Sequence, residues 1–189
     1  SSDLWPGWPV SCAREGQVLG WLVPNHQIRR AAWNSVLGQP RLTLCDGGSV
    51  TAIEPHADTN VVVLSDGQRL RARLVVAADS RFSATRRMMG IGAQMRDFGK
   101  SMMVCRMNHE GAHHHAAWEW FGYERTLALL PLNGNTASVV ITLPPAAMQA
   151  LQDCADEAFG QQVSAYFEHR LGAMSVPGTR HVYPLVGVY

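Results

Sequence analysis

The second half of the chain alternates apolar and polar positions, which is the period of a half-buried strand. Four such segments cover residues 100–110, 115–124, 126–133 and 136–145, with glycine-containing hairpin turns around Gly122 and at Asn133-Gly134-Asn135. A helical period follows from Pro145 to Leu171, where apolar residues recur every three or four positions. The pattern therefore predicts an antiparallel sheet, one long amphipathic helix, and a final strand-like segment at 179–189.

The first half has shorter and more varied patterns. Residues 1–17 combine Trp, Pro and Gly without a period, which favours an irregular loop. Asn25–Leu37 has a helical period that Gly38 ends. Three β-rich segments at 42–54, 61–67 and 69–79 then predict a small antiparallel sheet with tight turns. The last of these ends in the apolar run Leu74–Ala78, so we expect that strand to begin half exposed and to end buried.

Composition narrows the classes of function. The net charge of +1 gives no electrostatic reason to expect nucleic acid as a partner. Charged residues make up only 16% of the 189 residues, against roughly 25% in typical soluble proteins, so an apolar partner surface or larger assembly is consistent with the chain. No apolar run is long enough for a membrane span and no signal peptide pattern opens the chain, which favours a cytoplasmic location.

The cysteines and histidines do not form a motif of their own. Four widely spaced cysteines without a CxxC pair predict free thiols in a reducing compartment; they are Cys12, Cys45, Cys105 and Cys154. The histidines at 113, 114 and 115, with His109 nearby, lack an acid or cysteine at a useful spacing to complete a ligand set. We expect a surface loop there and no metal site.

The apolar run Leu74–Ala78 leads into Asp79 and Ser80 and then into a short basic helix. A carboxylate at a strand end could hold ribose or pyrophosphate groups, helped by the free backbone amides of the helix start. The alternative is a simple N-cap of that helix. Arg86 and Arg87 could likewise attract phosphate or merely stabilise the helix dipole.

In their order and motifs, these segments resemble the FAD-dependent aromatic-ring hydroxylases of the p-hydroxybenzoate hydroxylase fold. The ubiquinone-biosynthesis hydroxylases are the nearest of these. Four stretches carry the resemblance: residues 23–33, 65–87, 127–132 and 138–144. The most specific is the family pattern of a strand, Ala-Asp-Gly, a serine and an arginine, which is matched here by Ala78, Asp79, Ser80, Ser83 and Arg86. Ser80 replaces the family's glycine, at a cost if that position needs a positive φ angle.

The resemblance implies an α+β fold with two domains. Residues 1–90 would be part of an FAD-binding domain, with a small antiparallel sheet and helices. Residues 91–189 would be a substrate-binding domain, whose antiparallel sheet packs with the long helix. The family's GxGxxG and Gly-Asp motifs are not in the chain, so we expect the FAD-binding domain to continue beyond both ends.

The resemblance also assigns roles to residues. The expected FAD-binding residues are Asn25, Arg29, Asp79, Ser80, Ser83 and Arg86. The expected substrate-binding residues are Trp118, Trp120, Leu130 and Pro131. Large aromatic side chains on a strand are more often core, and many relatives have Arg-Phe where this chain has Trp120-Phe121. No residue is assigned a catalytic proton transfer.

The implied activity of the intact protein is hydroxylation of an aromatic ring with FAD, NAD(P)H and O2. A polyprenylated ubiquinone precursor would be the substrate, and the protein would work in the cytoplasm, with peripheral association at the inner membrane face or in a multi-enzyme complex. The chain by itself would be inactive. One alternative is a non-catalytic substrate-binding or scaffold module. Another is a related reductase or halogenase, although Lys100, the only lysine, has no halogenase-like surroundings.

Overall fold

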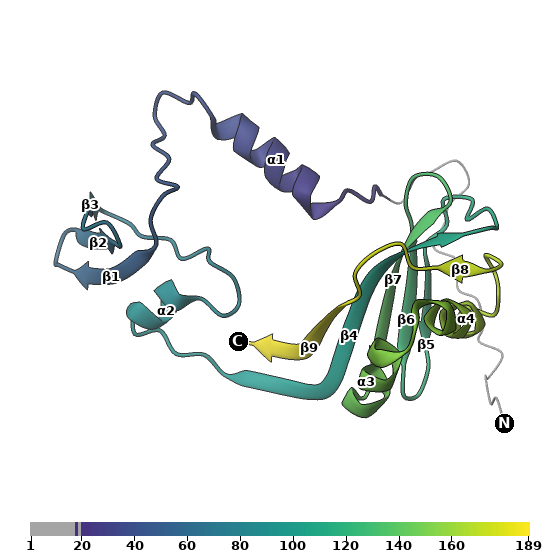
Figure 1. Ribbon diagram of the computed structural model, residues 1–189. Helices are drawn as coiled ribbons and strands as arrows, with labels where there is room; N and C mark the ends of the chain where they lie inside the picture. The colour runs from purple at the N-terminus through teal and green to yellow at the C-terminus, as the bar shows by residue number, and fades with distance from the viewer. Residues whose placement is uncertain (1–17, 19) are drawn as a thin grey trace. The chain divides into compact units, whose positions relative to one another are not determined.

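The computed structural model describes Val18 and residues 20–189. The predicted loop at residues 1–17 lies outside the described residues. Figure 1 shows the elements, which are α1 (Asn25–Val36), β1 (Val50–Pro55), β2 (Asn60–Leu64), β3 (Arg69–Ala72), α2 (Ala84–Met88), β4 (Met95–His109), β5 (Trp118–Phe121), β6 (Thr126–Pro131), β7 (Thr136–Leu143), α3 (Pro145–Asp153), α4 (Asp156–Tyr166), β8 (Met174–Ser175) and β9 (His181–Val188). The predicted α+β fold is confirmed.

The described chain divides into two compact units. One contains Asp97–Val186, and the other contains Asn25–Arg96 together with Gly187–Tyr189. The functional domains expected at 1–90 and 91–189 stay a prediction. No helix among the described residues is long and apolar enough to cross a bilayer.

The unit Asp97–Val186 is built on a six-stranded sheet in the order β5-β6-β7-β4-β8, and β9 also pairs with β4 (Figure 1). The antiparallel pairing of β4 with β7 runs without a bulge from Ser101 opposite Leu143 to Asn108 opposite Thr136. The predicted turns are confirmed, since the Gly122 amide donates to the Arg125 carbonyl across the β5–β6 turn. The alternating sequence thus specified these strands and their order along the chain.

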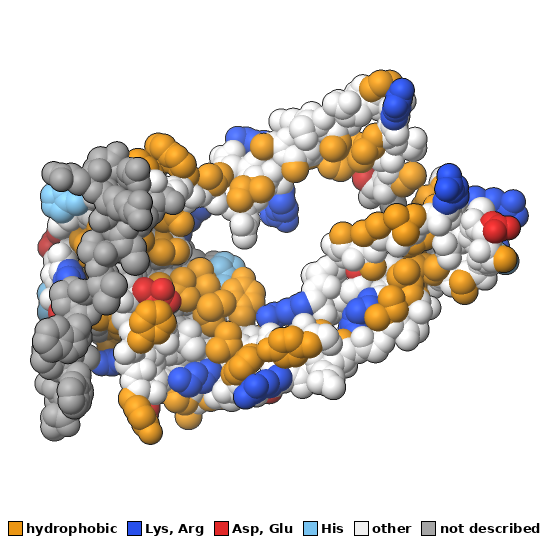
Figure 2. Space-filling model, turned by 180° about the vertical axis from the view of Figure 1, so that it is seen from behind, with side chains coloured by type: hydrophobic (Ala, Val, Ile, Leu, Met, Phe, Trp, Pro, Cys, Tyr) orange, Lys and Arg blue, Asp and Glu red, His pale blue; other side chains and the backbone are white. Residues whose placement is uncertain are grey.

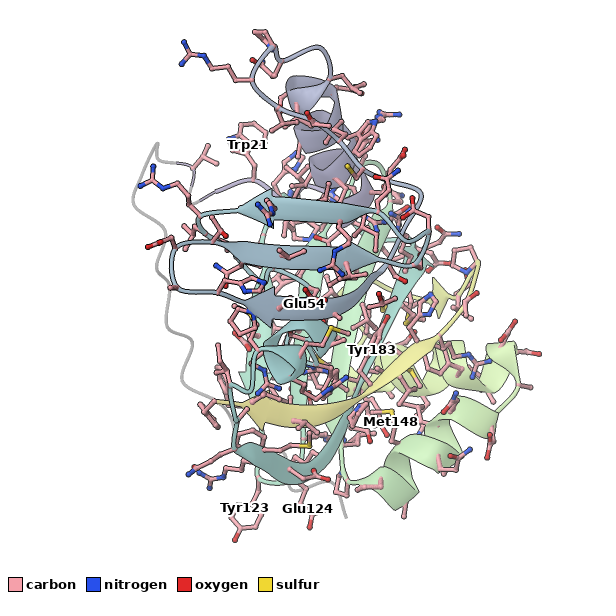
Figure 3. All side chains as sticks on the ribbon, turned by 90° about the vertical axis from the view of Figure 1, so that its left-hand side faces the viewer. Trp21, Glu54, Tyr123, Glu124, Met148 and Tyr183 are labelled. Atoms are coloured by element: carbon pink, nitrogen blue, oxygen red, sulfur yellow. The ribbon has the colours of Figure 1, made fainter. Side chains whose placement is uncertain are left out.

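The two faces of this sheet differ. We call the first the covered face, because α3 and α4 pack on it and its side chains form the core (Figure 1). Along β7 every second residue is fully or nearly fully buried, which is what period-two alternation produces when one face is covered. Met148 of α3, labelled in Figure 3, is 2% exposed within this core. The other side of the sheet, which we call the open face, carries half-buried and exposed side chains.

The single long helix predicted from Pro145 to Leu171 is wrong, because the segment forms two helices. The backbone turns extended at Cys154 and Ala155, with ψ angles of 150° and 153°. Pro144 and Pro145 do occupy the start of α3, as predicted. The apolar period continues across the break, so both helices still face the sheet and the sequence pattern alone does not reveal the interruption.

Arg180 explains why the break is stable. Its Nη1 donates to the carbonyl oxygens of Leu151 (3.2 Å) and Cys154 (2.9 Å), which the end of α3 leaves without helical partners. Its Nη2 pairs with Asp156 in the first turn of α4. The guanidinium also lies 4.5 Å from the centroid of the Phe159 ring. One side chain therefore satisfies the end of one helix and holds the start of the next.

Helix α4 approaches β8 closely because Gly160 has no side chain. A Cβ atom at Gly160 would lie 2.3 Å from the carbonyl oxygen of Met174. One turn later, the buried Ser164 hydroxyl accepts a hydrogen bond from the Met174 amide (3.0 Å) and donates to the Gly160 carbonyl (2.7 Å). The contact between α4 and β8 thus depends on a small residue and a buried hydroxyl at adjacent turns.

The unit Asn25–Arg96 contains a three-stranded antiparallel sheet in the order β1-β2-β3, along with α1 and α2. The helix predicted at Asn25–Leu37 is confirmed as α1. The predicted buried strand end is wrong, because Leu74 and Val76 are 77% and 75% exposed and β3 stops at Ala72. An extended segment needs a hydrogen-bonding neighbour to become a strand, and no described residue pairs with 74–78.

Candidate functional site

The turn at Asp79 is organised by hydrogen bonds to its carboxylate. Asp79 accepts one hydrogen bond from the Ser83 hydroxyl and another from the Thr85 amide (3.0 Å). The Ser83 oxygen in turn accepts from the Arg86 amide (2.8 Å), which makes Ser83 the N-cap of α2. The helix start was expected to present free amides, and this expectation is wrong for Thr85 and Arg86, because both amides already have acceptors.

These hydrogen bonds also stabilise the negative charge of the Asp79 carboxylate. The Ser83 hydroxyl, followed by the Thr85 amide, holds the pKa of Asp79 well below its ordinary value. Asp79 is therefore an anion at neutral pH. A carboxylate has more acceptor positions than the two used here, so Asp79 keeps the capacity to accept a hydroxyl group from a ligand.

Ser80 adopts a φ angle of 81°, in the left-handed region. This is the position where the sequence places serine in place of the family's glycine. A non-glycine residue there costs on the order of 1 kcal/mol, because its Cβ crowds the neighbouring carbonyl. The positive φ angle gives the family's glycine a physical reason, and Ser80 retains the conformation at a cost.

Of the remaining predicted FAD-binding residues, Asn25 and Arg29 are exposed and Arg86 is half-buried. Arg86 donates from Nη1 to the Ile91 carbonyl (3.3 Å), which leaves most of its donors available. Asn25 and Arg29 lie one turn apart on α1, none of whose residues is buried. Among the described residues, no hydrogen bond or ion pair joins α1 to the Asp79 turn, so the structure does not bring the two groups together. Their role in binding FAD stays a prediction.

Trp118 and Trp120 lie on the covered face of the sheet. Trp118 is the cross-strand partner of Leu129, which is fully buried. The Trp120 ring packs edge to face against Phe167 at 5.1 Å between centroids, and the Arg170 guanidinium lies 5.5 Å from its centroid. Both tryptophans therefore pack against the core and its rim.

Leu130 lies on the open face, whereas Pro131 is opposite the buried Ala137 in a row of the covered face. The four predicted substrate-binding residues are thus divided between the two faces of one sheet. Their substrate-binding role stays a prediction. At the hairpin between β5 and β6, Tyr123 and Glu124 project away from the sheet (Figure 3), and Tyr123 is fully exposed.

The histidines after β4 do not form the expected surface loop throughout. His113 is buried, and its Nδ1 accepts from the His115 amide (3.0 Å), so its Nε2 carries the proton and donates to the Leu132 carbonyl (2.9 Å). His109 is also buried, with Nδ1 2.8 Å from the Gly111 carbonyl oxygen. His114 and His115 are exposed. The His113 ring fastens the β4–β5 loop to the β6–β7 turn, whereas the His109 ring contacts only the loop itself. No metal-binding cluster exists among the described residues.

Comparison with known proteins gives the family context of this geometry. No protein-family model matches the chain. Ubiquinone hydroxylase UbiM from Neisseria meningitidis is 38% identical over 182 residues, which are 96% of this chain and 38% of that protein. The 3-demethoxyubiquinol 3-hydroxylase of Escherichia coli is 31% identical over 89% of this chain and 43% of its own length. The chain is a homologue of the ubiquinone hydroxylases.

The fold agrees with this relationship. The crystal structure of PqsL from Pseudomonas aeruginosa, described as a probable FAD-dependent monooxygenase, matches with a TM-score of 0.65 and 20% identity, over 83% of this chain and 46% of that one. The chain has the fold of this part of an FAD-dependent monooxygenase. It spans about two fifths of the length of the ubiquinone hydroxylases it matches.

Sequence reasoning missed two arginines that the structure places prominently. Arg106 lies on the open face of β4 beside Ser138 of β7. A single charge among the apolar residues of 102–107 was the available signal. Arg180 had no local signal, because its partners in α3 and α4 lie far from it in the sequence and only the folded chain brings them together.

Proposed function

We propose that the intact protein is an FAD-dependent monooxygenase that hydroxylates the aromatic ring of a polyprenylated ubiquinone precursor, with NAD(P)H and O2. The similarity to ubiquinone hydroxylase UbiM across nearly the whole chain is the observation that carries this proposal. The Escherichia coli and Neisseria relatives, both named as hydroxylases of ubiquinone or its precursors, support the same substrate class. A non-catalytic scaffold module is not favoured, because these relatives are named as hydroxylases.

The residues of the Asn25–Arg96 unit fit FAD by their chemistry. Carboxylate and amide oxygens suit ribose hydroxyls, while guanidinium and hydroxyl groups suit phosphates. The residues that would hold FAD are Asn25, Arg29, Asp79, Ser80, Ser83 and Arg86. Bound FAD would supply the redox chemistry, and the protein would supply orientation and exclusion of water.

The substrate would bind to the unit Asp97–Val186. We propose Trp118, Trp120, Leu130 and Pro131 as residues that shape its site, the tryptophans indirectly through the packing of β5. A polyprenyl chain is insoluble in water, so the protein would receive its substrate at a membrane surface or within an enzyme complex. The low fraction of charged residues in the chain supports such an association with a membrane or an enzyme complex.

Full-length protein tests the proposal. Purified protein should show the visible absorbance of a flavin, and its gene should restore ubiquinone synthesis in Escherichia coli lacking 3-demethoxyubiquinol 3-hydroxylase. Protein without flavin, together with failed complementation by well-expressed protein, would refute the proposal.

Neighbouring arginines on α1 provide a matched pair for FAD binding. Arg29→Ala should weaken FAD binding about tenfold, the value of one lost charge-assisted hydrogen bond. Arg30→Ala should leave it unchanged, because Arg30 points elsewhere and pairs with Gln27. Equal dissociation constants for both variants would remove Arg29 from the site.

A further inference from the structure

Two segments that lie far apart in the chain meet at the imidazole ring of His113, which is 6% exposed. Its Nε2 lies 2.9 Å from the Leu132 carbonyl oxygen and 3.1 Å from the Gly134 carbonyl oxygen, both in the β6–β7 turn. Its Nδ1 accepts a hydrogen bond from the His115 amide (3.0 Å) within the β4–β5 loop. One ring therefore joins the loop to the turn through both of its nitrogen atoms.

These contacts are compatible only with the neutral ring of His113. The His115 amide can donate to Nδ1 only while Nδ1 keeps its lone pair, and the two carbonyl oxygens require a proton on Nε2. A second proton on the ring would go to Nδ1, where it would face the N–H group of His115. It would also place a positive charge in a buried position. Protonation would therefore break the bond to His115.

The loop that this bond holds is strained. His114 and His115 have φ angles of 49° and 56°, in the left-handed region. That conformation is unfavourable for residues with a Cβ atom and persists where surrounding contacts hold it. The bond from the His115 amide to His113 Nδ1 is such a contact. Once the ring releases this amide, the loop has more favourable backbone conformations available.

Among the described residues, no carboxylate pairs with the His113 ring, so a charge on it would lack a partner. The rings that pack against it are two more imidazoles, His109 at 5.4 Å and His115 at 5.3 Å between centroids. The β6–β7 turn, residues 132–135, has no titratable side chain. Glu110 accepts a hydrogen bond from the Ala173 amide (3.1 Å). The other charged or titratable groups of the loop, and of the segment after α4 that bonds to it, are His114, Glu168, His169 and Arg170.

We propose that His113 is a proton-operated latch, which holds the β4–β5 loop against the β6–β7 turn when neutral and releases the loop when protonated. Imidazole is the side chain whose charge ordinarily changes between pH 5 and 8. Because the folded contacts need the neutral ring, their stabilisation is present at the alkaline end of this range and is lost as the pH falls. The turn follows Pro131 directly in the chain, so the latch would couple pH to the rigidity of this end of β6. The inference goes beyond the proposed activity and does not depend on it.

Amide hydrogen exchange of the full-length protein tests the latch. The protection factor of the His115 amide should fall about tenfold between pH 8 and pH 5, the effect of losing one hydrogen bond. His113→Gln should make this factor low and equal at both pH values. Glutamine stays neutral and can still donate to the Leu132 carbonyl, but it offers no acceptor at the position of Nδ1. His114→Gln, at the exposed neighbour, is the control and should keep the wild-type pH dependence.

His109 is the alternative source of a pH effect, because it is also buried and its Nε2 has no hydrogen-bond partner among the described residues. His109→Gln should retain the tenfold change in protection of the His115 amide. The inference is wrong if this change is absent from the wild type or persists in His113→Gln. A change that disappears only in His109→Gln would assign the proton to His109 and would equally contradict the latch.

The tautomer of His113 gives a second test, which does not require any variant to fold. In full-length protein with isotopically labelled histidine nitrogens, the His113 signals can be assigned through their proximity to the His115 amide. Their chemical shifts should show a proton on Nε2 alone at pH 8 and on both nitrogens at pH 5. A proton on Nδ1 at pH 8 would overturn the inference.

Discussion

The two units of the molecule differ in how far they bury their own apolar residues. The unit Asp97–Val186 has a continuous core in which Leu129 and Phe159 are fully buried. The unit Asn25–Arg96 buries few side chains below one tenth exposure, and α1 buries none. Figure 2 shows many apolar side chains left on the visible surface. The first unit thus has a hydrophobic core of its own, whereas the second presents apolar surface that its described residues do not cover.

Identical leucine truncations should separate the units most strongly. Leu129→Ala removes a fully buried side chain and should lower the free energy of unfolding by about 2–5 kcal/mol. Leu74→Ala removes an exposed one and should change it by less than about 0.5 kcal/mol. Urea titration of the chain, followed by fluorescence, measures both. A large loss of unfolding free energy for Leu74→Ala would show that residues 74–78 are buried after all.

A methyl group at Gly160 tests the close approach of α4 to β8. Gly160→Ala should destabilise the unit Asp97–Val186 by about 3 kcal/mol, because the new Cβ would overlap the Met174 carbonyl oxygen. Gly178→Ala is the control, since a Cβ there meets no atom within 4 Å. Thermal unfolding of the two variants should differ clearly, and similar midpoints would contradict the contact.

Replacement of the Arg180 guanidinium should weaken the junction between α3 and α4. Arg180→Lys should cost about 2 kcal/mol, because one ammonium cannot bond the α3 carbonyls and Asp156 together. Arg170→Lys, at an exposed ion pair with Glu168, should cost much less. Amide hydrogen exchange should then rise in α3 and α4 for the first variant only.

The Ser80 turn should respond in the opposite direction. Ser80→Gly relieves a left-handed serine and should stabilise the turn by about 0.5–1 kcal/mol, while Ser80→Ala keeps the Cβ and should give no gain. Local hydrogen exchange at the start of α2 reports the difference. Equal protection in both variants would mean that Ser80 carries no strain.

The smallest expected effect is the pH dependence of the same turn. The lowered pKa of Asp79 means that its contribution is fully present above the ordinary pKa of about 3.9 and is lost as the pH falls toward the folded value. The protection factor of the Thr85 amide, which already corrects for the intrinsic exchange rate, should therefore increase as the pH rises from strongly acidic values toward 4. Asp79→Asn should remove this pH dependence, and an unchanged profile would contradict the assignment.

The difference in burial between the two units also explains which features the sequence could predict. Alternation specifies the covered face in β4 to β7, and the turns predict the pairing of β5 with β6 and of β6 with β7, which follow one another in the chain. The pairing of β4 with β7 joins strands that are distant in the sequence, so local patterns do not reveal it. The break at Cys154 was hidden, since it depends on Arg180, a distant side chain. Leu74–Ala78 has the composition of a buried strand but no described neighbour to pair with. The division of Trp118 and Leu130 between two faces follows from register, which the resemblance did not supply.

The activity itself gives the most direct test of the account. Full-length protein should be supplied with NAD(P)H, a polyprenylated phenolic ubiquinone precursor and isotopically labelled O2, and the product analysed by mass spectrometry. The account predicts a product that has gained one labelled oxygen atom on its ring. Flavin-containing protein that oxidises NAD(P)H but never transfers labelled oxygen to such a ring would contradict it.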